Sequence, residues 1–548
     1  MDLKFVLPQE RIAAMTKAGF WHDRTVIDFL DEAANEVPDK IAFTDWNSTT
    51  GQATTFSFRQ MKKLSERLGA GLAALGVGKG DVVSYQLPNW WQFVALHLAS
   101  ARIGAITNPL MPIFRERELT HMLGLAESKV LVVPQRFRDF DYPAMVGNIR
   151  AKLPALKHLL VIGGEGEQSF EAFAARRWED ETDAQTLFAG RRQGPNEVTQ
   201  ILYTSGTTGE SKGVMQTANT MYSNLVEYAR RLKLEQNDVV LMASPLAHQT
   251  GFMYGMMMPI MLKAKTVLHD VWSGEAAAKR IQDEGCTFTM AATPFLADLA
   301  NLPTLGKHDI SSLRIFLCAG APIPEALAKN AAQRLGCAIM SAWGMTENGA
   351  VTTTKPGDPD AKVFGTDGCA LPGMEVKVVD AEGKTCPTGS EGDLKAKGAG
   401  IFVGYLKRPE LNGIDSDGWF DTGDRARMDA DGYIRITGRS KDIIIRGGEN
   451  IPVIEVEGIL YRHPAVQDVA VVAMPDARLG ERACAFATLK PGAPPLTLAD
   501  VRAFLAENKM AKNYYPERLE IVAEMPRTPS GKIQKFKLRD TAKSLKPE

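Results

Sequence analysis

Short runs of apolar residues recur along the first part of the chain, each about as long as a buried strand. They occupy residues 130–134, 158–164, 199–206, 238–245, 286–294 and 313–322. Between them, apolar residues recur at helical spacing, as Met221, Leu225, Tyr228 and Leu232 do. This alternation predicts an α/β architecture with largely parallel sheets. Because ligands of such sheets bind at the carboxyl ends of strands, we expect a site just after these runs.

The pattern changes from about residue 375 onward. Short strand-like segments separated by turn residues occupy 375–384, 391–400 and 429–439. They predict a small β-rich subdomain, which we place at about 350–440.

Beyond residue 441 the pattern becomes that of a compact α+β domain. Residues 466–474 and 518–525 are typical of strands, and residues 498–510 have helical spacing. Thr497 and Asp500 stand in capping-box positions at the start of that helix. We therefore predict a domain boundary near 440, with a large first domain at 1–440 and a small second domain at 441–548.

Composition narrows the class of protein. The 548 residues are 45% hydrophobic and 24% charged, as in ordinary globular proteins of several domains, and the formal net charge is −1. Such a balance offers no field for nucleic acid, so that partner is not expected. The six cysteines lack metal-ligand spacing and favour reduced thiols in the cytoplasm. The start lacks the pattern of a signal peptide, and the most apolar run, 251–262, is too short to span a bilayer.

Residues 203–213, YTSGTTGESKG, follow one of the predicted strands. Glycines expose backbone N–H groups, and the hydroxyls and Lys212 add donors for anionic oxygens, which suits a phosphate-binding loop. The loop is not a Walker A motif, because Ser211 precedes Lys212 and Gly213 follows it. A flexible surface loop is the alternative reading of this stretch alone.

Four other stretches carry candidate chemistry. In SAWGMTENG (341–349), Trp343 can stack on a base, Thr346 can bond a phosphate, and Glu347 can hold Mg²⁺. Further along, Asp424 can accept ribose hydroxyls with Arg439 beside it, and Lys532 lies in a loop able to present a mobile ammonium. Taken singly, each has an ordinary alternative as a core aromatic or a solvated charge.

The five motifs together, in this order, resemble the adenylate-forming superfamily of acyl-CoA synthetases, luciferases and nonribosomal adenylation domains. They are YTSGTTGESKG, SAWGMTE, WFDTGD, GRSKDIIIRGGENI and PSGKIQK. The resemblance spans nearly the whole chain and looks closest to short/medium-chain fatty acid or cyclohexanecarboxylate CoA ligases. It implies a large N-terminal domain of two α/β subdomains plus the β-rich subdomain, and a small mobile α+β C-terminal domain.

The resemblance also implies roles for individual residues. It assigns the phosphates of ATP to Thr204, Ser205, Gly206, Thr207, Thr208, Gly209 and Lys212. It assigns adenine to Gly320, Ala321, Pro322 and Trp343, although the family commonly has tyrosine at the last position. It assigns the α-phosphate to Thr346, Mg²⁺ to Glu347, and ribose to Asp424 and Arg439.

In the family, a carboxylate first joins the α-phosphate of ATP, and the acyl group then passes to a thiol. The resemblance gives Lys532 the role of neutralising the two anions in the first step. For the second step it places a hinge at Lys441, so that Gly447 and Gly448 line a pantetheine tunnel.

The family's acyl site corresponds to residues 245–262. His248 is expected near the carboxylate, and Phe252, Met253, Met256 and Met257 are candidate contacts of the acyl tail, with ordinary core packing of the methionines as an even alternative. We therefore expect an ATP-, Mg²⁺- and CoA-dependent ligase of a medium-chain or alicyclic acid, active as monomer or homodimer. Loading of an acyl or aryl acid onto a carrier protein and non-catalytic ATP binding remain alternatives.

Overall fold

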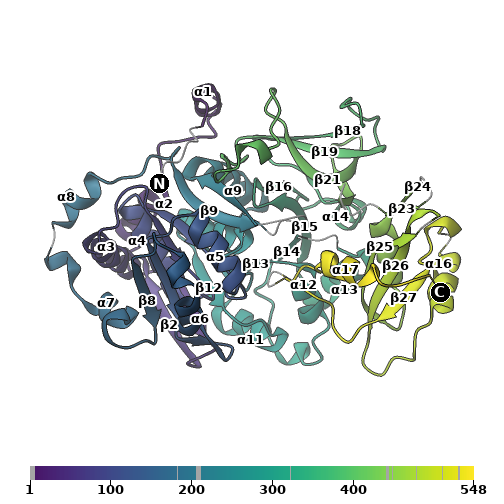
Figure 1. Cartoon of the computed structure of the whole chain (residues 1–548), viewed down its shortest axis with the longest axis horizontal. Helices are drawn as coiled ribbons and strands as arrows, with labels where there is room; N and C mark the ends of the chain where they lie inside the picture. The colour runs from purple at the N-terminus through teal and green to yellow at the C-terminus, as the bar shows by residue number, and fades with distance from the viewer. Residues whose placement is uncertain are drawn as a thin grey trace.

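The computed structural model describes most of the chain (Figure 1). The described residues are 7–181, 183–204, 211–320, 323–439, 444–446, 449–476, 478–508, 510–528 and 531–547. Of the sequence predictions, Ser205, Gly206, Thr207, Thr208, Gly209, Ala321, Pro322, Lys441, Gly447 and Gly448 lie outside the described residues.

A nine-stranded sheet forms one half of the large domain. Its order is β17 (Cys369–Ala370), β16 (Gly349–Thr353), β15 (Ala338–Met345), β14 (Ile315–Ala319), β13 (Phe288–Ala291), β11 (Val239–Met242), β12 (Lys265–His269), β1 (Ile41–Asn47) and β2 (Gln52–Ser57). The strands from β15 to β1 run parallel, and β2, β16 and β17 are antiparallel at the edges. Residues 349–370 thus extend this sheet, whereas the separate β-rich part begins at β18.

A seven-stranded sheet forms the other half. Its order is β20 (Gly404–Tyr405), β10 (Lys212–Thr217), β9 (Val198–Thr204), β4 (Ile106–Pro109), β3 (Val82–Tyr85), β5 (Val130–Pro134) and β8 (His158–Ile162). The strands from β9 to β8 are parallel, while β10 and β20 are antiparallel.

The largest core cluster joins the two sheets through three helices. It contains apolar residues of α3 (Phe58–Ala74), α4 (Trp91–Arg102) and α9 (Ala218–Leu232) together with residues of strands from both sheets. Helix α4 is buried from Gln92 to Arg102, as expected for a helix enclosed on all sides. The predicted pair of α/β subdomains is therefore confirmed.

Other helices cover the outer faces of the sheets. On the nine-stranded sheet, α11 (Gly274–Glu284), α12 (Thr293–Ala300) and α13 (Glu325–Leu335) enclose a second cluster. On the seven-stranded sheet, α5 (Glu116–Leu125) and α6 (Tyr142–Ile149) enclose a third. The connections between parallel strands thus place helices on both faces, which is the usual way such sheets are buried.

The β-rich subdomain is a four-stranded antiparallel sheet of β18 (Met374–Val379), β19 (Glu391–Gly398), β21 (Phe420–Met428) and β22 (Ile434–Arg439). Helix α1 (Gln9–Lys17) lies to one side of this sheet (Figure 1), where Arg11 donates to the carbonyls of Phe402 and Gly398 at 3.2 and 3.4 Å. Those bonds tie the beginning of the chain to a segment close to the candidate site.

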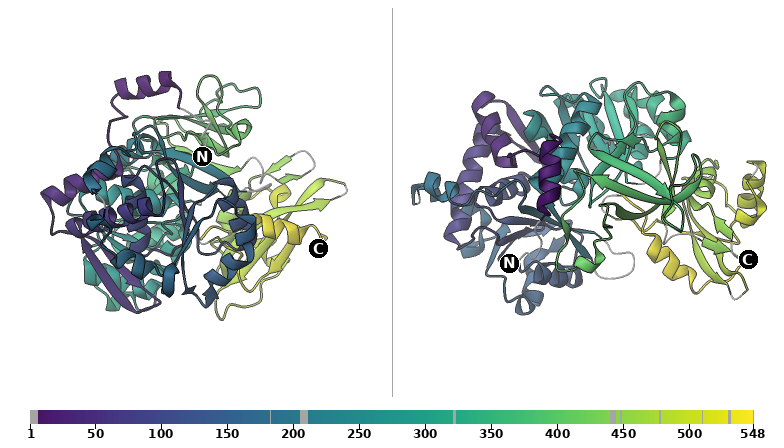
Figure 2. Two further views of the ribbon diagram at one scale, coloured as in Figure 1. Left: turned by 60° about the vertical axis from the view of Figure 1, so that its left-hand side comes forward. Right: turned by 90° about the horizontal axis from the view of Figure 1, so that it is seen from above.

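The C-terminal domain has its own five-stranded sheet. It contains β23 (Ile444–Arg446), β24 (Glu449–Ile451), β25 (Val466–Asp476), β26 (Gly480–Leu489) and β27 (Arg518–Ile521), with α15 (Val453–Leu460), α16 (Leu498–Glu507) and α17 (Lys535–Ala542). Thr497 caps α16 in the predicted box with Asp500. Figure 1 shows α17 of this domain beside α12 and α13 of the large domain, and the right-hand view of Figure 2 shows the domain next to the β-rich subdomain.

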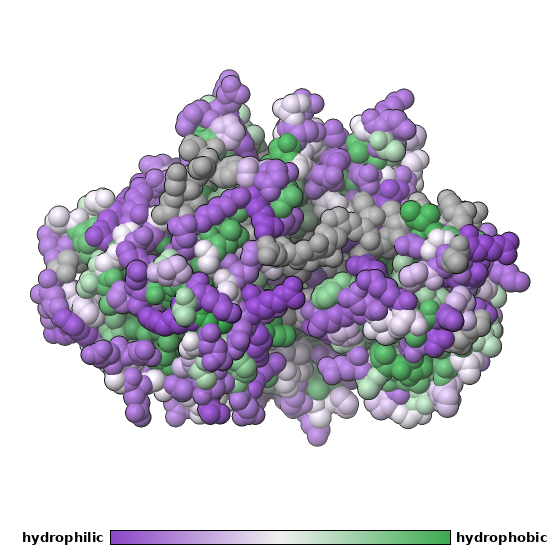
Figure 3. All heavy atoms as spheres, viewed as in Figure 1, coloured by the Kyte–Doolittle hydropathy of each residue, from purple (hydrophilic) through white to green (hydrophobic). Residues whose placement is uncertain are grey.

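The surface agrees with the balanced composition. The chain has 64 lysines and arginines against 65 aspartates and glutamates, and hydrophilic residues are spread over both domains on the face in Figure 3. Among the described residues, no helix combines the length and apolarity needed to cross a bilayer.

Candidate active site

The candidate chemistry gathers at one edge of the nine-stranded sheet. Strands β11, β13, β14 and β15 are parallel neighbours, so their carboxyl ends share an edge. His248 follows β11, Gly320 follows β14, and residues 346–348 form the turn between β15 and β16. His248, Gly320 and residues 346–348 thus follow strands as the sequence predicted, whereas Trp343 lies within β15, Asp424 on β21 and Arg439 at the end of β22.

The phosphate-binding motif begins and ends on a hairpin of the other sheet. Thr204, the last residue of β9, is the register partner of Lys212, the first residue of β10. The Thr204 hydroxyl is buried and has no hydrogen-bond partner within the described part of the chain. A buried hydroxyl without a hydrogen-bond partner costs free energy, so this position suits a hydroxyl that bonds to an oxygen of a ligand.

Glu347 is held from several sides. Its side chain accepts a hydrogen bond of 2.7 Å from the Tyr405 hydroxyl, and Glu347 is only 4% exposed. Its backbone carbonyl accepts from the Phe402 N–H at 2.7 Å. One residue earlier, the carbonyl of Thr346 accepts from Gln216 Nε2 at 2.9 Å. The turn that carries the predicted α-phosphate and Mg²⁺ residues is therefore fixed by β10 and the 402–405 segment.

The surroundings of Glu347 fit a magnesium ion shared with ATP. No group of three metal-ligating side chains occurs among the described residues. Mg²⁺ in nucleotide sites commonly takes only one or two carboxylates and completes its shell with phosphates and water. A single buried carboxylate, near the phosphate-binding hairpin, meets that requirement. Lys212 Nζ lies 3.9 Å from the centre of the Tyr405 ring, which connects the two parts of this corner.

Asp424 forms the centre of the predicted nucleoside part. Its Oδ2 accepts from Trp343 Nε1 at 2.8 Å, and its Oδ1 accepts from Arg439 Nε at 3.0 Å. Asp424 and Arg439 are register partners on β21 and β22. Trp343 packs in the core cluster of the β-rich subdomain and is 7% exposed. Its indole thus serves as a hydrogen-bond donor to Asp424, a contact that the sequence did not indicate.

Glycine is required where β15 turns into β16. A Cβ on Gly344 would lie 1.8 Å from the Gly349 carbonyl oxygen. The hairpin that carries the 346–348 turn therefore closes only with glycine after Trp343.

Lys532 of the C-terminal domain reaches this edge. A Cβ added at Gly320 would lie 2.8 Å from Lys532 Cε and 3.5 Å from its Nζ, and Gly320 has φ +93°. Burial, and then the positive charge of Arg439, lower the pKa of Lys532 to about 8, while Asp424 and Glu347 act in the opposite direction. The predicted catalytic ammonium thus lies among the predicted nucleotide residues.

His248 lies close enough to Lys532 for the lysine charge to affect the pKa of its imidazole. Burial, reinforced by Lys532, lowers the pKa of His248 to about 3. Its Nδ1 accepts from the Thr250 N–H at 3.3 Å. At neutral pH this imidazole is uncharged, so it can offer a hydrogen bond to a carboxylate but no ion pair.

The predicted acyl residues lie on η4 (Thr250–Met257), a π-helix, a form frequent at functional sites. Phe252, Met253, Met256 and Met257 are each at most 1% exposed and belong to the main core cluster. A Cβ on Gly349, at the start of β16, would lie 3.2 Å from Met253 Cε. The four side chains are therefore buried in one core cluster, and Met253 lies beside the start of β16.

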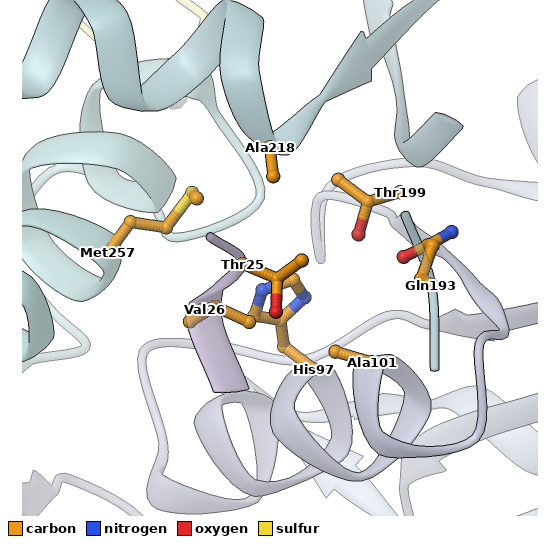
Figure 4. Close-up of a pocket in the computed structure, with 8 residues that line it drawn as sticks. All are labelled: Thr25, Val26, His97, Ala101, Gln193, Thr199, Ala218 and Met257. Carbon is orange, nitrogen blue, oxygen red and sulfur yellow. The ribbon is translucent and has the colours of Figure 1, made fainter. Parts of the chain in front are cut away.

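A small cavity of about 10 Å³ lies beside Met257 at the end of η4, and its volume is enough for one water. Figure 4 shows Met257 and the His97 imidazole among its lining residues. His97 Nε2 has no hydrogen-bond partner in the described part of the chain, and the ring packs edge-on against Phe252, with 4.7 Å between centroids.

Comparison with known families decides the class. Residues 30–406 match a family described as AMP-binding enzyme, and residues 455–532 match the AMP-binding enzyme C-terminal domain. The chain belongs to the AMP-binding enzyme family. The adenylate-forming resemblance expected from the motifs is confirmed.

Other members of the AMP-binding enzyme family match along nearly the whole chain. The medium-chain fatty-acid–CoA ligase of Escherichia coli strain K12 is 37% identical over 541 residues, covering 98% of this chain and 94% of that protein. The 2,3-dihydroxybenzoate-AMP ligase of Bacillus subtilis strain 168 is 32% identical over 537 residues, covering 97% and 96%.

Solved structures match equally broadly. ATP-bound MatB from Rhodopseudomonas palustris superposes with a TM-score of 0.84 at 27% identity, covering 95% of this chain and 99% of that one. Apo MatB gives 0.73 at 28% identity over 95% and 99%. The chain is an AMP-forming acid–thiol ligase, and its cofactors are ATP, Mg²⁺ and CoA.

Proposed function

We propose that this enzyme activates a medium-chain or alicyclic monocarboxylic acid as its acyl-adenylate and transfers the acyl group to CoA. The observation that carries the proposal is the position of Lys532, next to Gly320 and within electrostatic reach of Asp424, Glu347 and Arg439. The higher TM-score with ATP-bound than with apo MatB supports an arrangement suited to the ATP-dependent step.

In the first step a carboxylate oxygen forms a bond to the α-phosphorus, and the bond from that phosphorus to the bridging oxygen of pyrophosphate breaks. Two anions must approach each other, so positive charge between them lowers the barrier. Lys532 supplies that charge from the protein, and Mg²⁺, when held by Glu347, supplies charge to the phosphates. Thr346 and the Thr204–Lys212 hairpin orient the phosphates, and the uncharged His248 donates to the carboxylate.

In the second step the thiol sulfur bonds to the acyl carbon and gives up its proton to solvent. The bond from that carbon to the bridging oxygen of the acyl-phosphate anhydride breaks, and AMP leaves with its electron pair. The thiol would need the space that Lys532 and pyrophosphate occupy in the first step. We therefore keep the prediction that the C-terminal domain rotates about Lys441 and presents Gly447 and Gly448 to the site. Lys441→Pro is expected to spare pyrophosphate exchange and suppress thioester formation, with Lys441→Ala as the control that keeps the backbone free. Full overall turnover by the proline variant would move the hinge elsewhere.

The nature of the acid follows from the acyl wall. Residues 245–262 contain no charged side chain, so this stretch offers no ion-pair partner for a second carboxylate or an amine. The thioethers of Met253, Met256 and Met257 are flexible and can yield to a tail of moderate size. The similarity to the medium-chain ligase of Escherichia coli supports the same choice.

A second candidate function is the loading of an acyl or aryl acid onto the phosphopantetheine thiol of a carrier protein. The similarity to the 2,3-dihydroxybenzoate-AMP ligase of Bacillus subtilis favours an aryl acid. Carboxylate-dependent exchange between pyrophosphate and ATP, measured with straight-chain, cyclohexane and benzoate-type acids, tests the acid. Discharge of the resulting acyl-AMP by CoA or by a phosphopantetheinylated carrier protein tests the acceptor.

We expect the fastest exchange with medium-chain or cyclohexane acids and discharge by CoA. Preference for benzoate-type acids with discharge only by the carrier would replace our proposal with the second candidate. Absence of exchange with every acid would support ATP binding without catalysis.

A further inference from the structure

Tyr405 lies between two residues that handle opposite charges in the predicted ATP site. It is 2% exposed and pairs through its backbone with Val214 of β10. Its N–H donates to Asn412 Oδ1 at 2.8 Å, and its ring packs against Phe402 with 4.8 Å between centroids. The ring therefore has one fixed position.

The two ends of this side chain contact different charges. The face of the ring lies 3.9 Å from Lys212 Nζ, within the range of a cation–π interaction. The hydroxyl donates to Glu347 Oε1 at 2.7 Å. Burial and the neighbouring carboxylate raise the pKa of Tyr405, so the phenol keeps its proton and remains a donor. A carboxylate has two oxygens, and the bond to Oε1 leaves Oε2 for another ligand.

The segment around Tyr405 also fixes the backbone of Glu347. The Phe402 N–H donates to the Glu347 carbonyl, and the Phe402 carbonyl accepts from Arg11 at 3.2 Å. Glu347 is thus oriented through both its side chain and its backbone by one short stretch of chain, which α1 anchors from outside.

We propose that Tyr405 is a positioning residue that keeps Lys212 and Glu347 from pairing directly and orients each of them for a separate part of Mg²⁺–ATP. This inference rests on the proposed function. The ring holds the lysine near the phosphate-binding hairpin, and the hydroxyl sets the plane of the carboxylate. Without this spacer, the ammonium and the carboxylate would form an ion pair that ATP must break.

Two substitutions separate the ring from the hydroxyl. Tyr405→Phe keeps the ring and removes the donor, whereas Tyr405→Leu removes both. Tyr433→Phe is the matched control, because the Tyr433 hydroxyl donates to Asp358 Oδ1 at 2.8 Å and none of these residues belongs to the site. Binding of a non-hydrolysable ATP analogue is measured by calorimetry with Mg²⁺ and with EDTA. This readout does not require turnover, so it stands apart from the acid and acceptor tests of the proposed function.

We expect Tyr405→Phe to bind the analogue with wild-type affinity in EDTA. The increase in affinity that Mg²⁺ gives should be about 10-fold smaller than in the wild type, because loss of a hydrogen bond to a metal ligand typically has an effect of this size. Tyr405→Leu should also bind about 10-fold more weakly in EDTA, because Lys212 is then held by Glu347. The control should match the wild type in both conditions. Circular dichroism compares the folding of all three variants.

A double-mutant cycle guards against a general loss of structure. If Tyr405 acts through Glu347, Tyr405→Phe should add nothing to the Mg²⁺ dependence of Glu347→Gln. Additive losses, or an unchanged Mg²⁺ dependence in Tyr405→Phe, would overturn the carboxylate half of the proposal. Metal-free binding by Tyr405→Leu equal to that of the wild type would overturn the lysine half. If the leucine variant does not fold, Tyr405→Met, which also lacks the ring, takes its place, and metal-free binding equal to that of the wild type would again overturn the lysine half.

Discussion

Buried neighbours within the large domain hold Glu347 and Asp424 by hydrogen bonds. Lys532, in contrast, lies on a turn of the small domain, and hydrogen bonds within that turn hold its backbone. Tyr405 and Trp343 donate to the two carboxylates at 2.7 and 2.8 Å. Within the described residues, the hydrogen bonds of Lys532 lie in its own turn: its N–H donates to Thr528 Oγ1 at 3.0 Å, and its carbonyl accepts from the Thr528 N–H at 2.7 Å. The residues predicted to bind the nucleotide are thus fixed within the large domain, whereas the predicted catalytic lysine is carried by the small domain.

This contrast explains how one site can serve two steps. Residues that bind ATP need no rearrangement when they are fixed by the sheet, which preserves their electrostatic effect. A lysine carried by a separate domain can leave without disturbing them. Changes on the large domain should therefore affect nucleotide binding, and changes on the turn should affect only adenylation.

The largest effect is expected from Lys532→Ala. Loss of one preorganised positive donor costs on the order of 10²- to 10³-fold in rate. Adenylation should fall by that factor, while thioester formation from supplied acyl-AMP should stay nearly unchanged, as stopped assays of each half-reaction would show. Lys535→Ala is the matched control, because Lys535 lies on the same domain and pairs with Glu457 at 2.6 Å. Equal damage to both half-reactions would remove Lys532 from its assigned role.

On the large domain, Trp343→Phe should weaken nucleotide binding by about 10-fold, since Asp424 would lose a buried hydrogen bond. Equilibrium binding of AMP measures the nucleotide affinity directly and does not depend on the adenylation step, in which Lys532 is expected to act. Trp419→Phe is the control, because Trp419 lies near Lys377 with 4.2 Å between the ammonium and the ring. Unchanged AMP affinity in Trp343→Phe would show that the indole donor does not support the nucleoside side.

The pH dependence of adenylation should reflect the ionisation of Lys532. The pKa of Lys532 is lowered to about 8, mainly by burial. Its charged form is the active one, so kcat/KM for adenylation should be full below that pH and fall about 10-fold per unit above it. Lys532→Arg keeps the charge at high pH and should abolish this decline. A decline that persists in the arginine variant would belong to another group.

The sequence predicted those features of the fold that depend on residues close together in the chain. Strands at 130–134 and 313–322 and the capping of α16 depend on neighbours in the chain, and the structure has them. The domain boundary near 440 and the residue roles remain predictions. Tyr405 and the donor role of Trp343 were missed because they depend on pairings between distant segments: β20 with β10, and Trp343 with an aspartate 81 residues away. The only local signal for Tyr405 was an aromatic residue after Gly404 at the end of an apolar run.

The smallest effect is expected where the Lys532 turn meets the large domain. Arg527 Nη1 donates to the Gly531 carbonyl at 2.7 Å, and its Nη2 pairs with Asp468 at 2.7 Å. The charges of Arg527 and Asp468 both reach Asp298 of α12, and a Cβ on Gly531 would lie 3.3 Å from the Phe295 ring. Arg527 thus supports the turn and faces the helix on which the turn rests.

Arg527→Met should therefore slow adenylation by about 3- to 5-fold, the size expected for a partly exposed ion pair with one added hydrogen bond. Discharge of acyl-AMP should be unaffected, because Lys532 is not needed there. Arg527→Lys restores the charge but not the two-sided geometry, so it should recover only part of the rate. Arg518→Met, which removes an ion pair with Glu520 elsewhere on the same domain, is the control. If both half-reactions slow equally in Arg527→Met, the residue stabilises the domain as a whole, and the turn is positioned by its backbone alone.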